Sequence, residues 1–560
     1  ILFIIIALSL VQCTNEEQNP VPEVLSVTPS SKVAHLPEFT IIVNGQDFVD
    51  GSVIIFDGKE KATTFISLSQ LSCRISPEDT MMDIVSNNTD ADEIMNMEEV
   101  VSVVVRNPAP GGGDSAQLNF TVKENFEFES PVRLFDSIVN GWAGPLIIDE
   151  NDDLYLNIAD AEVNKFNVKF TNFLSISGDK GDTWSDPESF VRKAELYNEN
   201  LLMDEYGNIH FIYGDFSISN SSVFYKKKNK GASSWSEPVN IAGEDKSVYY
   251  NYFEHKAAIK GDKIFVFWTV YTKSYDEFLV YTFSEDNGSS WSEPIRLKDL
   301  GYVGWIDSLI SEDGTLHLVY GKAIRKASWE FFVDIYTARS IDNGVTWSEP
   351  VMISNGAGRS YYPQISYSGK GENFKIFWIY KQTGQVIKNM VANLNMKKME
   401  IIKRMSEGLS PVTDQPDQSN IVIPPSFHLR MRGSEDGGNS WETELNILDF
   451  NSDDYYFVMH FDVKTDIAGN LNLIVNEHIY FYGIASTSNH INSEIKTAYF
   501  TRSIDGGANW TTPVQFSDDP EVIAEFLNVD SEGNVYFLLN KYDFSEYFKV
   551  EPYFSRNIRN

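Results

Sequence analysis

The chain has 560 residues, with 80 acidic and 45 basic side chains and a formal net charge of −35. A surface this acidic repels phosphate backbones and anionic membrane surfaces, so we expect no nucleic-acid partner. Hydrophobic residues make up 42% of the sequence, which is enough for two domains with packed cores. The two cysteines, Cys13 and Cys73, allow neither a disulfide framework nor a Cys-based metal site.

The first thirteen residues predict export. An apolar run covers residues 1–11 and ends at Gln12-Cys13, which is too short to span a bilayer and typical of the apolar part of a signal peptide. The segment Leu10-Val-Gln-Cys13 is similar to a bacterial lipobox, which implies that Cys13 is a lipid anchor at the outer membrane or cell surface. The alternative is an ordinary secretion signal. Residues 14–22 read as a linker.

Residues 23–124 carry alternating apolar runs that predict strands, among them 53–56 and 100–105. The segments Val24-Leu-Ser-Val-Thr-Pro29, Phe39-Thr-Ile-Ile-Val-Asn-Gly45 and Arg106-Asn-Pro108-Ala-Pro-Gly111 resemble an IPT/TIG domain. The resemblance implies an immunoglobulin-like sandwich that acts as a spacer or contact module. An acidic, Met-rich stretch at 78–99 is expected to be a loop inserted in that sandwich.

A short pattern, Ser-x-Asp-x-Gly-x-x-Trp, recurs five times between residues 177 and 510. In such a turn the Asp carboxylate accepts backbone N–H groups, Gly supplies a positive φ, and Trp inserts a large apolar ring between neighbouring elements. We therefore interpret these residues as structural and not catalytic. The repeated Asp and Trp positions are Asp179, Trp184, Asp286, Trp291, Asp342, Trp347, Asp436, Trp441, Asp505 and Trp510, with a degenerate sixth copy at Trp235.

The spacing between successive Trp residues is 51, 56, 56, 94 and 69, close to the length of a four-stranded propeller blade. We expect the 94-residue gap to hide a blade without the pattern, and the run 126–134 to supply the strand that closes the ring. The fold prediction is all-β: an N-terminal immunoglobulin-like (IPT/TIG) sandwich at 23–124 and a six- or seven-bladed β-propeller of sialidase type at 125–560.

The repeats make residues 125–560 similar to the Asp-box (BNR-repeat) propellers of sialidases. The resemblance implies exo-glycosidase activity that uses three Arg, an Asp acid/base and a Tyr–Glu nucleophile pair. The first Arg motif is matched only in part, at Arg133, and the other two Arg are not placed. Three functions stay open: a cell-surface or secreted carbohydrate-interacting protein without demonstrated catalysis, a sialidase-like exo-glycosidase, and a protein-binding adhesion module.

Aromatic and acidic residues gather where each innermost strand is expected to begin. Aromatic rings stack on the apolar face of a pyranose, glycoside hydrolysis needs two carboxylates or a Tyr nucleophile, and an Arg can bind a sugar carboxylate. The alternative is that these rings pack between blades. The candidates are Glu254, Asp307 and Tyr361 for catalysis, and Arg359, Tyr362, Trp305, Tyr252 and Trp142 for ligand binding.

The eight histidines include no His-x-x-x-His or His-x-His pair, so neither a zinc site nor a cofactor is expected. The partners that we expect are a glycan or polysaccharide, another surface protein through the N-terminal domain, and the membrane only through the lipid anchor.

Overall fold

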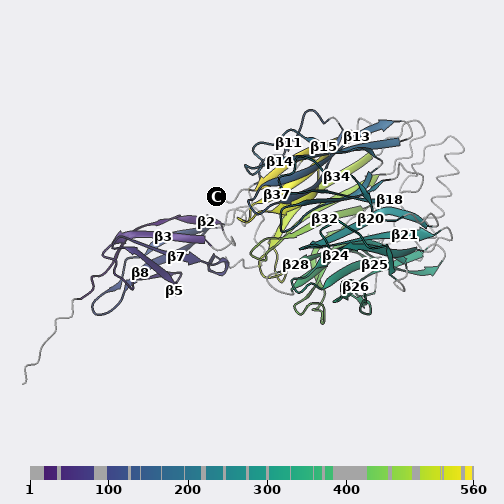
Figure 1. Cartoon of the computed structure of the whole chain (residues 1–560). Helices are drawn as coiled ribbons and strands as arrows, with labels where there is room; N and C mark the ends of the chain where they lie inside the picture. Colours follow the sequence, from purple (N-terminus) through teal and green to yellow (C-terminus); the bar gives the residue numbers. More distant parts are fainter. Residues whose placement is uncertain are drawn as a thin grey trace, which may run out of the picture. The chain divides into compact units, whose positions relative to one another are not determined.

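The structure is a computed structural model and consists of two compact units, residues 1–127 with 559–560 and residues 128–558 (Figure 1). The residues described are 18–33, 39–80, 98–123, 128–138, 140–164, 167–194, 196–215, 222–243, 248–272, 277–297, 302–327, 330–356, 359–368, 373–382, 426–451, 457–481, 492–511, 513–517, 519, 522–543 and 549–557. Cys13 and most of the 78–99 stretch lie outside them.

The N-terminal unit is a sandwich of two sheets. One sheet has the strand order β1 (Glu23–Thr28), β3 (Phe39–Gln46), β7 (Gln70–Ile75), β6 (Thr63–Ser67). The other has the order β2 (Ser31–Val33), β10 (Leu118–Lys123), β8 (Glu98–Asn107), β4 (Val53–Phe56), β5 (Lys59–Glu60), with β9 (Gly113–Asp114) on β8; a short 3₁₀ helix spans Pro77–Thr80. Both sheets contribute to one apolar core, which includes Val43, Phe120 and Cys73. Burial raises the pKa of the Cys73 thiol to about 12.

The described residues of the second unit form seven four-stranded antiparallel sheets, which we number as blades 1 to 7. Blades 1 to 3 are β12 (Gly141–Ile148), β13 (Leu154–Asn164), β14 (Asn167–Ser177), β15 (Glu188–Ala194); β16 (Leu196–Met203), β17 (Ile209–Asp215), β18 (Ser222–Lys228), β19 (Val239–Asn240); and β20 (Val248–Lys260), β21 (Lys263–Thr272), β22 (Glu277–Ser284), β23 (Ile295–Leu297). Blades 4 to 6 are β24 (Tyr302–Ile310), β25 (Leu316–Ala327), β26 (Glu330–Ser340), β27 (Val351–Met352); β28 (Arg359–Tyr367), β29 (Phe374–Gln382), β30 (Ser426–Ser434), β31 (Leu445–Asn451); and β32 (Phe457–Thr465), β33 (Leu471–Phe481), β34 (Asn492–Ser503), β35 (Val514–Ser517).

Blade 7 joins the two ends of this unit. It consists of β36 (Val522–Val529), β37 (Val535–Asp543), β38 (Lys549–Asn557) and β11 (Val132–Arg133), which pairs with β38. The first strands of successive blades contact one another around the whole ring, from β12 to β36 and back to β12. In Figure 1 the yellow strands of the chain end accordingly lie against the blue strands of blade 1. The all-β prediction is confirmed, and the blades number seven.

The expectation that the 94-residue gap hides a separate blade is wrong. The strands at Arg359–Tyr367 and Phe374–Gln382 pair directly with Ser426–Ser434, which leads into the Asp-box of Trp441. Both belong to one sheet, blade 5. The extra length is residues 383–425, inserted between the second and third strands of that blade.

Each Asp-box turn is held by its own side chains, as the box of blade 3 illustrates. Ser284 Oγ donates to Asp286 Oδ1 (2.8 Å) and accepts from the Gly288 N–H (2.8 Å). The hydroxyl and the N–H of Ser290 both donate to the Asp286 carboxylate. The bonds from Ser290, and then that from Ser284, lower the pKa of Asp286 to about 2. The same Ser–Asp bond recurs at Asp179, Asp342, Asp436 and Asp505.

The Trp that ends each turn packs on the preceding blade. Trp291 of blade 3 lies edge-on to Tyr225 of blade 2, with ring centroids 4.9 Å apart. Trp184 of blade 1 contacts Phe554 of blade 7 in the same way, at 5.4 Å. The box therefore joins neighbouring blades, as the sequence pattern predicts.

This packing leaves no room beside the box glycine. A Cβ on Gly288 would overlap the Tyr225 hydroxyl, whereas one on Gly314, in the first turn of blade 4, meets nothing within 4 Å. Both glycines have positive φ, at +79° and +88°. We expect Gly288→Ala to lower the free energy of unfolding by at least about 2 kcal/mol more than Gly314→Ala, because only the first adds overlap to backbone strain. Urea denaturation of both variants measures this, and equal losses would contradict it.

Three histidines of the propeller, His210, His255 and His317, are almost fully buried, at 0 to 2% exposure. Burial lowers the pKa of each to about 4. Between pH 6.5 and 4 the unfolded chain therefore binds protons that the folded chain does not, and stability falls as the pH falls.

We expect His255→Gln to remove the contribution of one histidine to the pH dependence of the free energy of unfolding, up to about 1.4 kcal/mol per pH unit. The measurement is the urea midpoint of wild type and variant at pH 7 and pH 5. The variant should lose less stability between these two values than the wild type. An unchanged difference would show that His255 does not titrate in this way.

Among the described residues no helix is long and apolar enough to cross a membrane.

Candidate functional site

The antiparallel order of each blade assigns its loops to two opposite faces. First strands begin, and second strands end, on one face, which we call the entry face. The first turns and the Asp-box turns lie on the other, the Asp-box rim. Residues at the start of a first strand therefore share the entry face, close to the axis of the ring.

Three aromatic residues come together at the entry of blades 4 and 5. Trp305 of β24 lies 5.1 Å from both Tyr361 and Tyr362 of β28, measured between ring centroids. The planes of Trp305 and Tyr361 are 85° apart, and the two tyrosine rings are 6.4 Å apart. Tyr362 is 44% exposed and Trp305 is half-buried. We call Trp305, Tyr361 and Tyr362 the aromatic platform.

The backbone beneath the platform adopts a conformation that is rare outside glycine. Trp305 has φ +50° and Tyr362 has φ +53°. Each lies in a bulge of its first strand, where the pairing register shifts. Such residues cost about 1–3 kcal/mol each and occur mainly where function requires a particular side-chain direction. Two neighbouring blades thus bear this strain at equivalent positions, and in both the side chain belongs to the platform.

Gly321 of β25 makes room for the Trp305 ring. A Cβ on Gly321 would lie 3.2 Å from Trp305 Cε3 and 2.7 Å from the Gly304 oxygen. The indole therefore lies against bare backbone of the second strand.

Asp307, two residues after Trp305, is half-buried and faces blade 5. Its Oδ2 accepts the Ile365 N–H at 2.9 Å. Burial raises the pKa of Asp307 above its ordinary value, against the lowering effects of Lys256 and of the Ile365 N–H. The carboxyl group has a raised pKa, which suits a proton donor, and comes two residues after Trp305 of the platform, but one of its oxygens already joins two blades.

Equivalent positions in other blades make the same kind of bond, a pattern that the sequence analysis missed. Asn200 Oδ1 accepts from Ala257 N, Gln364 Oε1 from Val463 N, and Asp462 Oδ2 from Leu527 N. Asp462 also forms an ion pair with Lys464 (3.1 Å). Burial lowers the pKa of Lys464, but the negative charge of Asp462 opposes this, and the pKa is raised overall. The signal was available, because each polar residue lies four positions before the residue that opens the first turn.

The other predicted residues are not joined to the platform by any described contact. Trp142 lies in blade 1, where it packs edge-on to Phe170 with centroids 5.6 Å apart. Tyr252 and Glu254 lie in β20 and Arg359 in β28, but their side chains are outside those that the structure describes.

The half-buried carboxylate of Glu199, at the entry of blade 2, accepts from the Asn157 amide. Burial raises the pKa of Glu199, and its bonds to Asn172 and Asn157 oppose the rise. No group of three or more His, Cys, Asp or Glu suited to a metal ion occurs among the residues described.

No protein-family model and no curated protein matches the sequence. Solved structures with similar chain traces include the Hadza microbial sialidase Hz136, at 12% identity and a TM-score of 0.39, covering 81% of this chain and 94% of that one. They also include a Trypanosoma rangeli sialidase in complex with the inhibitor DANA (12%, TM-score 0.35, 67% and 56%).

A further match is a Penicillium chrysogenum α-L-arabinanase complexed with arabinobiose (13%, TM-score 0.36, 63% and 94%). Identities and TM-scores are all low, so the function has to be inferred from the residues of this chain.

We expect Asp307→Ala to lower the free energy of unfolding by about 1–2 kcal/mol, because it leaves the Ile365 N–H without its acceptor. Asp307→Asn keeps an acceptor oxygen and should stay close to the wild type. Urea denaturation of both variants at pH 7 measures the difference. Equal stability of the two variants would mean that the bond to Ile365 contributes nothing.

Proposed function

We propose that the propeller binds glycans on its entry face through the aromatic platform. The observation that carries this proposal is the strained backbone at Trp305 and Tyr362, which holds two rings of adjacent blades against each other with Tyr362 open to solvent. Exposed aromatic rings offer an apolar surface to the face of a pyranose at little entropic cost. Neighbouring carboxyl and hydroxyl groups, such as those of Asp307 and Tyr361, suit the sugar hydroxyls.

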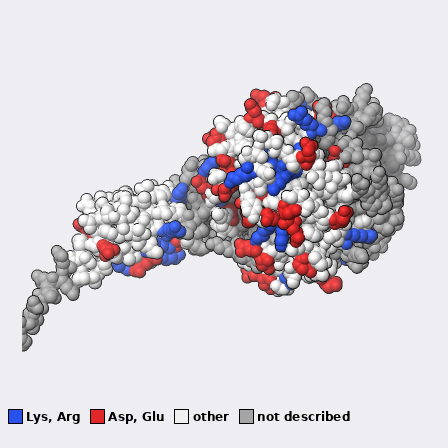
Figure 2. Space-filling model, in the orientation of Figure 1, with Lys and Arg blue, Asp and Glu red and all other residues white. Residues whose placement is uncertain are grey.

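The negative charge of the protein affects which glycans it can bind. The chain carries a net charge of −35, and on the face shown in Figure 2 the described Lys and Arg side chains lie among Asp and Glu. Anionic polysaccharides are therefore expected to bind less well than neutral ones unless a local cation compensates. Arg359, which begins the strand that carries Tyr361 and Tyr362, is the candidate for that cation.

Export and surface display complete the proposal. We infer that Cys13 carries a lipid anchor and that the N-terminal sandwich, an IPT/TIG-like module, holds the propeller away from the membrane as a spacer. Hydrolysis remains a second candidate because Asp307 has a raised pKa and comes two residues after Trp305 of the platform. In that case Glu254, Tyr361 and Arg359 are the further residues to test.

We expect Trp305→Ala and Tyr362→Ala each to weaken glycan binding by tenfold or more, about 1.4 kcal/mol, since each removes a stacking surface. A glycan array followed by calorimetry with the best ligand measures this. Tyr206→Ala is the matched control, because Tyr206 is an exposed tyrosine (50%) in a first turn, on the Asp-box rim. Unchanged affinity in both platform variants would reject the site.

The same glycans should be incubated with the protein and any released sugar identified by mass spectrometry. Release that is lost in Asp307→Asn, a variant expected to keep its fold, would establish a hydrolase. Binding without release would leave a lectin-like protein. Neither binding nor release would favour the adhesion alternative, with a protein as the partner.

A further inference from the structure

The first strands of blades 2 to 6 carry a polar residue at one equivalent register position. In four of these blades its side-chain oxygen accepts an N–H group of the next first strand. In blade order the five residues are Asn200, Lys256, Asp307, Gln364 and Asp462. Lys256 is the exception, because an ammonium group cannot accept a hydrogen bond.

The Lys256 ammonium group is not used to hold blades 3 and 4 together. Lys260, four residues further along β20, makes such a contact, since its Nζ donates to the main-chain oxygen of Ser311 in blade 4 (2.9 Å). Lys256 is half-buried and has no hydrogen-bond or ion-pair partner among the residues that the structure describes. A lysine at a position that elsewhere joins two blades is thus left with its charge unpaired.

The charge of Lys256 acts on Asp307 of the next blade, although the two groups form no ion pair. Burial raises the pKa of Asp307, and Lys256 is the strongest of the groups that oppose this rise. More than 4.0 Å separates the Nζ atom from the carboxyl oxygens, because both residues are described and no ion pair joins them. Both residues are half-buried and so keep contact with solvent. The two groups are therefore neighbours at a separation that a bridging polar group would close.

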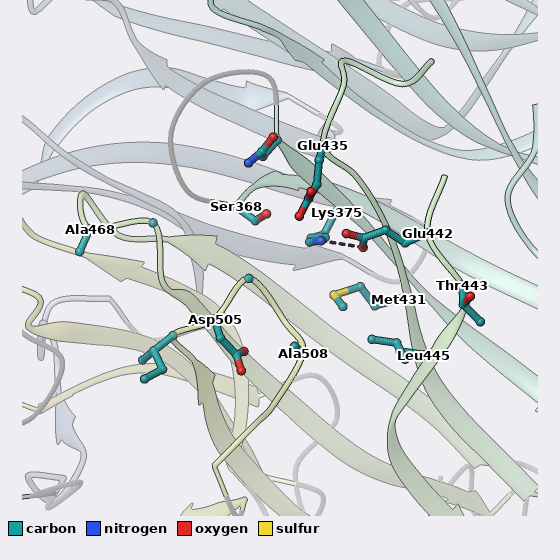
Figure 3. Close-up of a pocket in the computed structure, with 14 residues that line it drawn as sticks. Ser368, Lys375, Met431, Glu435, Glu442, Thr443, Leu445, Ala468, Asp505 and Ala508 are labelled. Atoms are coloured by element: carbon teal, nitrogen blue, oxygen red, sulfur yellow. Dashed lines mark hydrogen bonds and ion pairs between the residues drawn. The ribbon is translucent and has the colours of Figure 1, made fainter. Parts of the chain in front are cut away.

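A lysine on the Asp-box rim shows the contrasting case. Lys375 lies opposite Gly433 in the neighbouring strand of blade 5. Its Nζ is 2.7 Å from Glu442 Oε2, in a cleft of about 480 Å³ that Figure 3 shows. The charge of Lys375 is thus satisfied within the chain, whereas that of Lys256 is not.

A hydroxyl group suits the position between an ammonium group and a carboxylate. It accepts a hydrogen bond from the first and donates one to the second at the same time. An anion would be repelled by Asp307 and by the net charge of −35, and a cation would be repelled by Lys256. A site built to hydrogen-bond a hydroxyl group also rejects an analogue that lacks it, because its polar groups are then left unpaired.

We propose that Lys256 is a specificity-determining residue of the glycan site, and that its ammonium group and the Asp307 carboxylate together bind one hydroxyl group, or two adjacent ones, of a neutral pyranose. The inference rests on the proposed glycan-binding function. Asp307 comes two residues after Trp305 of the platform, about 7 Å along an extended strand. A sugar that stacks on the platform, or the next sugar of the same glycan, can therefore reach the pair.

The test compares the wild type with Lys256→Met, which removes the charge and keeps the length of the side chain. The probes are methyl β-D-glucopyranoside, methyl β-D-galactopyranoside and methyl α-D-mannopyranoside, each titrated into the full chain by ligand-observed NMR. We expect Lys256→Met to bind the best of the three about fivefold or more weakly, because a charge-assisted hydrogen bond is lost. Lys230→Met is the matched control: it removes one positive charge on the Asp-box rim, from a side chain that is 55% exposed, and should bind like the wild type.

Monodeoxy derivatives of that sugar identify the hydroxyl group. One derivative should bind the wild type about fivefold more weakly than the parent sugar does, and bind Lys256→Met as well as the parent does, since the two changes remove the same interaction. Equal affinity of both proteins for the parent sugar, or equal discrimination by both, would overturn the proposal. So would a preference of the wild type for methyl β-D-glucuronide that Lys256→Met loses, because Lys256 would then bind an anion.

Stability separates a binding role of Lys256 from a structural one. Because Lys256 has no described hydrogen bond or ion pair, Lys256→Met should keep the urea midpoint of the wild type. If this variant is unstable, Lys256→Gln, which stays polar, must show the loss of binding at the midpoint of the wild type. Lowered midpoints in both variants would indicate a structural role and overturn the proposal.

The role of Lys256 and the glycan-binding function can fail separately. Binding that is lost in Trp305→Ala but unchanged in Lys256→Met would leave the platform standing and reject only the role of Lys256. Binding of none of the three monosaccharides would also reject that role, while the glycan array decides on the glycan-binding function.

Discussion

The Asp-box turn packs against the preceding sheet and recurs around the propeller. The assembly of the seven blades depends on this contact. A four-stranded sheet has two faces to cover, and each blade covers them with its two neighbours. The Ser and Asp of the box hold the turn rigid from within, so the Trp reaches the neighbouring blade in one defined direction. The polar groups of the turn are hydrogen-bonded within the turn itself. The turn therefore keeps one conformation when it contacts the neighbouring sheet.

A second set of contacts, hydrogen bonds between the first strands of neighbouring blades, positions the candidate site. Polar side chains such as Asp307 and Gln364 reach across to the backbone of the next first strand. With the middle of each strand held in this way, the segment before it can accept a bulge and positive φ at Trp305 and Tyr362. The platform is thus a local departure from regular strand geometry that a regular scaffold supports.

The parts of this architecture that depend on short stretches of sequence were predictable. The Asp-box encodes its own turn within eight residues, and alternating runs encode strands, so the all-β fold and the inter-blade role of Trp291 and Trp184 follow directly. The blade of Trp441 was misread because spacing measures only chain length, and a long insertion between paired strands looks the same as an additional blade.

Contacts set by register were harder to predict. Trp305, Tyr361 and Tyr362 were each chosen as aromatic residues at strand entries, and so was Trp142, but only the sheet order shows that the first three meet while the last lies in blade 1. The pair Lys375–Gly433 has no sequence signal until the second and third strands are aligned. Blade 7 is completed by β11, from the start of the unit, which pairs with the third strand β38; there Ser555 Oγ also donates to the Glu129 oxygen, across 426 residues. Because β11 precedes blade 1 and β38 follows blade 6, the ring can close only after blade 7 has been synthesised, and until then blade 1 lacks one of its two neighbours. Ring closure therefore rests on a strand pair between distant parts of the chain, and such non-local pairing is the slow part of folding in β proteins.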